Sequence, residues 1–188
     1  MNNPFAFLIT SLFELYVYVI LIRFFLQAVR ADFYNPVSQF AVKATNPVLV
    51  PLRKLIPGFG GMDVASIVFA YAVNLLKWVA LAGLGFTSFG SMGYVGIVVF
   101  VLFELMYLTF GLFIFLAFIR IILSWISPGG YNPMTALIHQ LTDPLFRPFQ
   151  KIIPPMGGLD LSPILMFMVL YFVRQAIPYF LYPIAFSL

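Results

Sequence analysis

Charged side chains inside long apolar segments are the residues of this sequence most able to do chemistry. There are six of them: Glu14, Arg23, Lys77, Glu104, Arg120 and Arg174. A charge near the centre of a bilayer costs at least about 2.5 to 3.5 kcal/mol on insertion scales, so it usually faces a protein interior and a partner. Two interpretations follow. The charges either form a polar path for an ion or proton, or they form buried ion pairs that fix how helices pack.

Four of these residues make up the candidate intramembrane polar core: Glu14, Lys77, Glu104 and Arg174. Glu14 and Lys77 each lie 13 residues from the expected cytoplasmic end of their segment, about 20 Å away at 1.5 Å per residue. We therefore expect them to meet. Glu104 is expected about 10 Å further from the cytoplasm, with no partner assigned.

Two arginines fall near the expected cytoplasmic ends of their segments. Because long basic side chains extend toward the membrane surface, Arg23 and Arg120 are expected to reach lipid phosphates.

The composition predicts an all-α membrane protein. Hydrophobic residues make up 63% of the 188 and charged residues only 9%, against about a quarter charged in soluble domains. Four stretches have the roughly 20 apolar residues that a transmembrane helix needs. They run from about Pro4 to Gln27, Val64 to Phe86, Tyr94 to Ser124 and Pro163 to Phe186. Pro178 is expected to bend the last one.

Residues for catalysis or cofactor binding are scarce. The sequence has no cysteine and one histidine, and it contains no Ser-His-Asp set, glycine-rich phosphate loop or cluster of metal ligands. We expect a protein that is not an enzyme, needs no cofactor and binds no nucleic acid.

The basic residues outside the apolar segments are confined to the two long connections between them. These connections contain Arg30, Lys43, Arg53, Lys54, Arg147 and Lys151, whereas the two chain ends and the turn at 87–93 contain no Lys or Arg. By the positive-inside rule, the connections lie in the cytoplasm and both termini on the opposite side.

The sequence contains an internal repeat with an offset of 97 residues. Between positions 34 and 63, 12 of 30 residues are identical to those at 131–160, without a gap. Each copy contains two spans, so the copies are parallel and related by a pseudo-two-fold axis along the membrane normal. We place repeat 1 at 1–90 and repeat 2 at 91–188. The offset also equates Lys77 with Arg174.

Each connection is expected to form two short amphipathic helices at the cytoplasmic surface. In repeat 1 they begin at Asn35-Pro36 and Asn46-Pro47, where Asn is a good N-cap and Pro fits the first helical position. Asp63 and Asp160 are expected to cap the spans that follow. The alternatives are that the apolar faces rest on the membrane, that they pack on the spans, or that the segment re-enters the bilayer, since Pro51 and Pro148 would kink the second helix. Four basic residues are candidates to face anionic phospholipid or a protein partner: Arg53, Lys54, Arg147 and Lys151.

These repeated motifs support a family resemblance. With Asp32-Phe33-Tyr34-Asn35-Pro36, Asn46-Pro47, Pro51-Leu52-Arg53, Ile56-Pro57 and Asp63, the whole chain resembles the bacterial YggT family of two-repeat inner-membrane proteins, related to the YlmG proteins of plastids. The second copy departs from the pattern, with Gly129-Gly130 in place of Asp32-Phe33 and Gln150 in place of Arg53.

The resemblance implies two classes of function. Bacterial members are associated with tolerance of osmotic shock through ion homeostasis, which implies a channel-like or transport-modulating homo-oligomer in the inner membrane. Plastid relatives are linked to haem attachment in cytochrome b maturation and to nucleoid or membrane organisation, which implies a non-transporting assembly factor.

Overall fold

A computed structural model describes residues 3–31, 35–90, 92–126, 132–152 and 162–188. Within these residues, four helical segments are long and apolar enough to cross a membrane: Pro4–Ala28, Val64–Gly83, Tyr94–Leu123 and Ser162–Phe186. Their bounds agree within three residues with the spans predicted from hydropathy. The all-α class and the four membrane-spanning helices are therefore confirmed.

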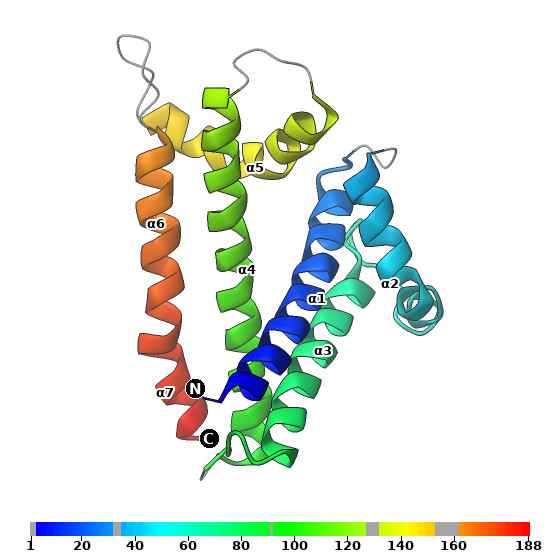
Figure 1. Cartoon of the computed structure of the whole chain (residues 1–188), viewed down its shortest axis with the longest axis vertical. Coiled ribbons are helices and arrows are strands. Elements are labelled where there is room, and N and C mark those ends of the chain that lie inside the picture. The colour runs from blue at the N-terminus through cyan, green and yellow to red at the C-terminus, as the bar shows by residue number, and fades with distance from the viewer. Residues whose placement is uncertain (1–2, 32–34, 91, 127–131, 153–161) are drawn as a thin grey trace.

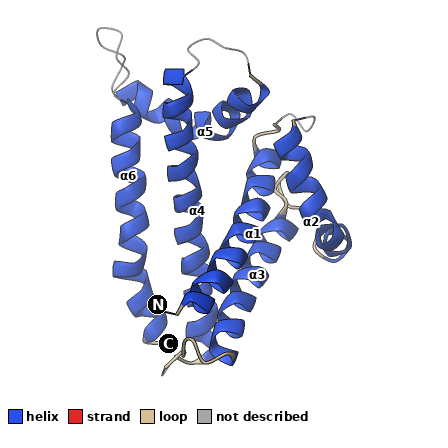
Figure 2. Ribbon diagram, viewed as in Figure 1, coloured by secondary structure: helices blue, strands red, loops and turns tan. Residues whose placement is uncertain are grey.

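The helices form two hairpins joined by a short turn (Figure 1). The first pairs α1 (Pro4–Ala28) with α3 (Val64–Gly83), and the second pairs α4 (Tyr94–Ile126) with α6 (Ser162–Ala176). Both termini and the α3–α4 connection lie at one end of the bundle, whereas α2 (Pro36–Leu55) and α5 (Pro133–Ile152) lie toward the other (Figure 2). This arrangement fits parallel repeats with an even number of spans.

In the described part of each long connection there is one helix, where the sequence predicted two. The α2 helix continues through Pro47 and Pro51, and α5 continues through Pro144 and Pro148. A proline removes one hydrogen bond and bends a helix, but the neighbouring hydrogen bonds can carry the helix past it. Figure 1 shows α2 changing direction along its length. The two predicted helices are therefore the two arms of one bent helix.

The start of α2 is also a contact between the two repeats. The Asn35 side chain accepts a hydrogen bond from the Val37 amide at 2.9 Å, and Asn132 caps α5 in the same way through Met134 at 2.9 Å. The cap predicted at Asn35 is confirmed, whereas the cap predicted at Asn46 is wrong, because Asn46 lies inside α2. The Asn35 amide group also donates to the Pro133 carbonyl at 2.9 Å, which joins the first turns of α2 and α5.

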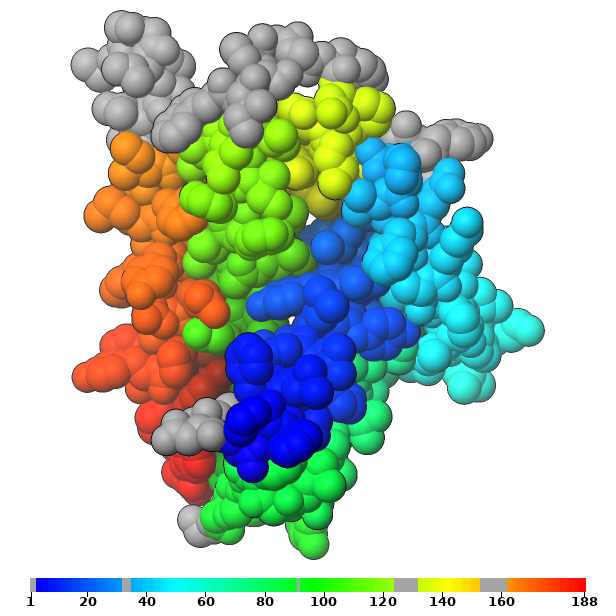
Figure 3. Space-filling view, viewed as in Figure 1, coloured from blue at the N-terminus to red at the C-terminus, as the bar shows by residue number. Residues whose placement is uncertain are grey.

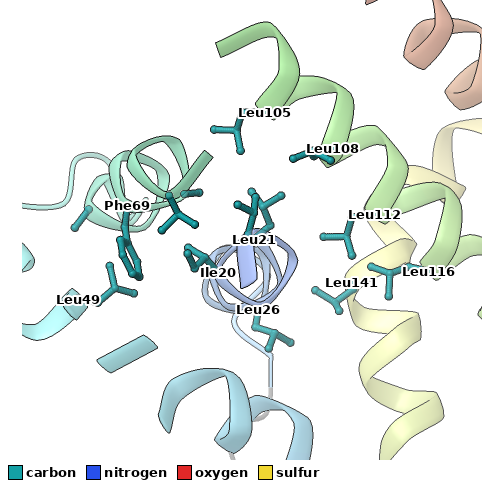
Figure 4. Packing of buried hydrophobic residues seen from close by; sticks show 14 of the residues in the cluster. Ile20, Leu21, Leu26, Leu49, Phe69, Leu105, Leu108, Leu112, Leu116 and Leu141 are labelled. Atoms are coloured by element: carbon teal, nitrogen blue, oxygen red, sulfur yellow. The ribbon is translucent and has the colours of Figure 1, made fainter. Parts of the chain in front are cut away.

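The largest apolar core surrounds α1 (Figure 4). On one side, Leu21 faces Leu108 and Leu112 of α4, and on the other, Ile20 lies near Phe69 of α3. Leu49 of α2 and Leu141 of α5 also belong to this core. Part of each amphipathic face therefore packs on the spans, which is one of the alternatives given above. Phe40 and Leu55 of α2 remain exposed.

The last span changes its helical geometry at Pro178. A π-helical turn, η1 (Ile177–Leu181), separates α6 from α7 (Tyr182–Phe186), and the Tyr182 amide donates to the Ile177 carbonyl. Proline has no amide hydrogen, so the α-helical hydrogen bonds are interrupted at Pro178. The wider π-helical turn restores backbone hydrogen bonding at Tyr182. The bend expected at Pro178 takes this form.

Two glycines at the start of α4, Gly93 just before it and Gly96 within it, allow residues 185–188 to lie against it. A Cβ at Gly93 would lie 2.7 Å from the Leu188 carbonyl oxygen, and a Cβ at Gly96 would collide with the Ala185 carbonyl oxygen. Small residues commonly permit such close approach between membrane helices.

We expect Gly96→Ala to destabilise the protein by about 1 to 3 kcal/mol, because α7 must move away from α4 to admit the methyl group. Heat unfolding of the purified protein in detergent measures this change. Gly83→Ala is the matched control, since a Cβ at Gly83 meets nothing within 4 Å. Equal unfolding temperatures for the two variants would contradict the role of Gly96.

Candidate functional site

A buried ion cluster joins three spans near the middle of the bundle. The Lys77 ammonium of α3 lies 3.1 Å from the Glu14 carboxylate of α1 and 2.8 Å from the Glu104 carboxylate of α4. The Lys77 side chain is 1% exposed, that of Glu104 9% and that of Glu14 29%. The meeting of Glu14 and Lys77 that helical rise predicted is confirmed.

The expected depth of Glu104 is wrong. Glu104 binds the same ammonium as Glu14, so the two carboxylates lie at nearly the same level. Each glutamate is ten residues from the outer start of its helix, at Pro4 in α1 and Tyr94 in α4. The α4 helix has 33 residues and α1 has 25, and this added length lies at the other end. Because the depth was counted from the expected cytoplasmic end of the span, Glu104 was placed too far from the cytoplasm.

Trp78 completes the cluster and was missed in the sequence. Its indole N–H donates to the second oxygen of Glu104. One turn earlier, the Asn74 amide donates to the Val101 carbonyl of α4 at 3.2 Å. Tryptophan and asparagine donors in an apolar segment need hydrogen-bond partners. Asn74, Lys77 and Trp78 have the spacing i, i+3 and i+4, and this spacing could have identified them as one face of the helix. The polar residues of α3 thus form one stripe facing α4.

Arg174 does not join this cluster. Its guanidinium carbon lies 4.1 Å from the centre of the Tyr107 ring, a cation–π geometry. No ion pair involves Arg174 among the residues described, and its Nε atom is buried without a hydrogen-bond partner. The structure therefore brings three of the four predicted core residues together and leaves the fourth apart.

The two arginines expected at lipid phosphates are instead held by the amphipathic helices. Arg23 is buried and donates to the Val42 carbonyl at 3.1 Å and to the Thr45 hydroxyl. Arg120 donates to the Thr142 hydroxyl at 2.8 Å and pairs with Asp143 at 2.7 Å. The threonine follows its arginine by 22 residues in both copies. The internal repeat already indicated this contact, because the offset of 97 residues aligns the two arginines with each other and the two threonines with each other.

Arg53 has a partner within the chain, although its side chain remains 36% exposed. It donates to Asp63 through Nε at 3.2 Å and to the Gln27 side chain at 3.0 Å. Asp63 lies at the N-cap position of α3, but its side chain makes no cap hydrogen bond. Burial alone would raise the pKa of Asp63, yet the hydrogen bonds from Arg53 and Ser66 outweigh burial and hold its pKa below the usual range. Asp160 lies outside the described residues.

The other candidate basic residues remain on the surface. Lys54 at the end of α2 and Arg147 and Lys151 on α5 are all exposed. Next to them, Leu55 and Ile152 are exposed apolar side chains. Basic and apolar groups therefore lie together on both amphipathic helices.

Comparison with known proteins assigns the family. The model of the CCB3/YggT family matches residues 2–84 and 99–181, two segments that begin and end 97 residues apart. The chain belongs to the CCB3/YggT family. The resemblance drawn from the repeated motifs is confirmed, and the family match has the same offset as the repeat.

Bacterial relatives cover nearly the whole length of this chain, and a plastid relative covers part of it. An uncharacterised protein in the proC 3' region of Vibrio alginolyticus is 44% identical over 99% of this chain and 100% of its own. YggT of Escherichia coli K12 is 36% identical over 93% of this chain and 89% of its own. The chloroplastic YlmG homolog protein 2 of Arabidopsis thaliana is 46% identical over 28% of this chain and 20% of its own. No solved structure matches.

We expect Lys77→Met to destabilise the protein by about 3 to 5 kcal/mol, because it leaves the buried Glu104 carboxylate and the partly exposed Glu14 carboxylate without their cation. Heat unfolding in detergent measures the loss. Glu14→Gln serves as the comparison and should cost less, since Glu14 is the more exposed partner and Lys77 keeps Glu104. If Lys77→Met unfolds at the temperature of the unsubstituted protein, the cluster does not hold the spans together.

Proposed function

We propose that this protein supports osmotic stress tolerance or ion homeostasis in the bacterial inner membrane, as a non-enzymatic, channel-like or transport-modulating oligomer. The observation that carries the proposal is the ion cluster of Glu14, Lys77 and Glu104 within spans that are otherwise apolar. Ionisable groups at such depth are rare in membrane proteins and usually mark ion pathways, proton relays or switches. The family resemblance favours the same class of function.

The closed geometry of the cluster supports an oligomer over a pore within one chain. Lys77 is almost wholly buried and binds both carboxylates, so within one chain it lines no water-filled path. Glu14 is the member of the cluster that reaches the surface of the bundle. A polar path that uses this charge would therefore run between neighbouring copies of the chain.

The distribution of basic residues supports an orientation. All six Lys and Arg residues outside the spans belong to the connections that contain α2 and α5: Arg30, Lys43, Arg53, Lys54, Arg147 and Lys151. We propose that this end faces the cytoplasm and that the termini face the periplasm.

Ion flux into liposomes that contain the purified protein tests the proposal. We expect flux above that of empty liposomes, and a lower flux with Glu14→Gln, because this variant removes the most accessible intramembrane charge. Lys54→Gln, which changes an exposed basic residue outside the spans, should leave the flux unchanged. Flux no greater than that of empty liposomes would contradict a channel-like function.

A second candidate function is a non-transporting assembly or organising factor, of the kind that supports cytochrome maturation or recruits a partner. The observation in its favour is the exposed basic surface of Lys54, Arg147 and Lys151 beside exposed Leu55 and Ile152. Such surfaces bind anionic lipid, and each basic residue near the membrane surface contributes about 1 kcal/mol. A protein partner with an acidic surface would bind to the same basic and apolar side chains.

Simultaneous Lys54→Gln, Arg147→Gln and Lys151→Gln substitutions separate the two candidates. For the organising function we expect less phosphatidylglycerol bound to the purified protein, measured by native mass spectrometry, and a loss of osmotic tolerance in cells. Lys43→Gln, an exposed basic residue on the first arm of α2, is the control. Unchanged tolerance with the triple variant and lost tolerance with Glu14→Gln would contradict the organising function.

A further inference from the structure

Arg174 occupies the repeat position of Lys77 but has an environment of a different kind. Two carboxylates hold Lys77, whereas Arg174 forms no ion pair within the described part of the chain. Its Nε–H group is buried and unpaired, and its guanidinium lies over the Tyr107 ring. The ring supports the positive charge but accepts no strong hydrogen bond. Arg174 thus keeps unused donor capacity near the middle of its span.

A cavity of about 380 Å³ lies between α1 and α4, next to this group. Its walls are almost wholly apolar and include Tyr18 and Val19 of α1 and Gly111 and Phe115 of α4. A Cβ at Gly111 would lie 3.4 Å from both the Arg174 Nε atom and the Tyr18 hydroxyl oxygen. Two polar groups therefore approach one point at the cavity wall, and Gly111 leaves that point open. Figure 3 shows α1, in blue, on the front face beside α4 in green.

We propose that this cavity binds a carboxylic acid with a hydrocarbon tail, and that Arg174 and Tyr18 hold its carboxylate. A guanidinium group matches the two oxygens of a carboxylate through parallel N–H donors, and a phenol O–H adds a third. The apolar walls then accommodate the tail. A halide ion would fill only a small part of such a cavity and would leave its aliphatic surface without a partner.

The apolar walls of the cavity favour a protonatable ligand over a permanent anion. A permanent anion would have to pass the apolar surface of the spans as a charge, which is costly, whereas a carboxylic acid passes it uncharged. A carboxylic acid enters uncharged, passes the proton of its O–H group to the Glu14 carboxylate, and remains as a carboxylate beside Arg174. The protonated Glu14 then gives up its ion pair with Lys77, which keeps its pair with Glu104. Glu14 lies one helical turn from Tyr18 on α1 and is the more exposed of the two glutamates.

Photolabelling of the full chain in lipid nanodiscs tests this site. The probe is dodecanoic acid with a diazirine near the end of its tail, and mass spectrometry locates the labelled peptides. We expect labels on the α1 and α4 peptides that contain Val19 and Phe115, with competition from unlabelled dodecanoate but not from dodecanol. Arg174→Gln should reduce labelling by about tenfold or more, because a charge-assisted hydrogen bond is lost.

Further variants guard against misfolding and against binding of the tail alone. Tyr18→Phe removes only a hydroxyl group and should reduce labelling, and Gly111→Val should block the cavity. Lys43→Gln, a change of an exposed basic residue outside the spans, should have no effect. Labelling that is unchanged in Tyr18→Phe and Gly111→Val would overturn the proposal, as would equal competition by dodecanol or by sodium chloride. The outcome does not depend on ion flux in liposomes, so this proposal and the proposed function can fail separately.

Discussion

The position of the Lys77 ammonium between Glu14 and Glu104 is the interaction on which the rest of the structure depends. It joins α1 and α3 of the first repeat to α4 of the second. Apolar contacts alone give such a bundle little direction, because lipid tails are as apolar as the leucines between the helices. A buried charge with two partners allows only one register, since sliding a helix by one turn would leave charges unpaired in a low-dielectric environment.

Polar contacts that occur in both repeats have a different structural role from those that occur once. The Arg23–Thr45 and Arg120–Thr142 bonds each attach an amphipathic helix to a span of its own repeat. The Asn35–Pro133 bond and the Lys77–Glu104 pair connect the two repeats and have no symmetric counterpart in the described residues. The repeated contacts therefore build each unit, whereas the unique contacts determine how the two units join.

Sequence reasoning succeeded where one helix or the repeat contained the answer. Hydropathy predicted the spans, the cap chemistry of Asn35 was correct, and helical rise brought Glu14 to Lys77. It failed where the outcome depended on neighbours. The level of Glu104 depends on which end of α4 projects beyond the bundle, and the path of α2 through Pro47 depends on how both its arms pack. No residue pattern contains either fact.

The same asymmetry determines where the intramembrane charges can still interact with something else. Both glutamates of the spans converge on Lys77 and saturate it, so a new ligand there would have to displace a carboxylate from an ion pair. Arg174 receives none of this compensation, although the repeat gives it the equivalent position. The two copies of this span each contribute one cation. Within the described residues, Lys77 is paired with both Glu14 and Glu104, whereas Arg174 has no ion pair. The Arg174 charge beside an apolar cavity is the more accessible place for chemistry.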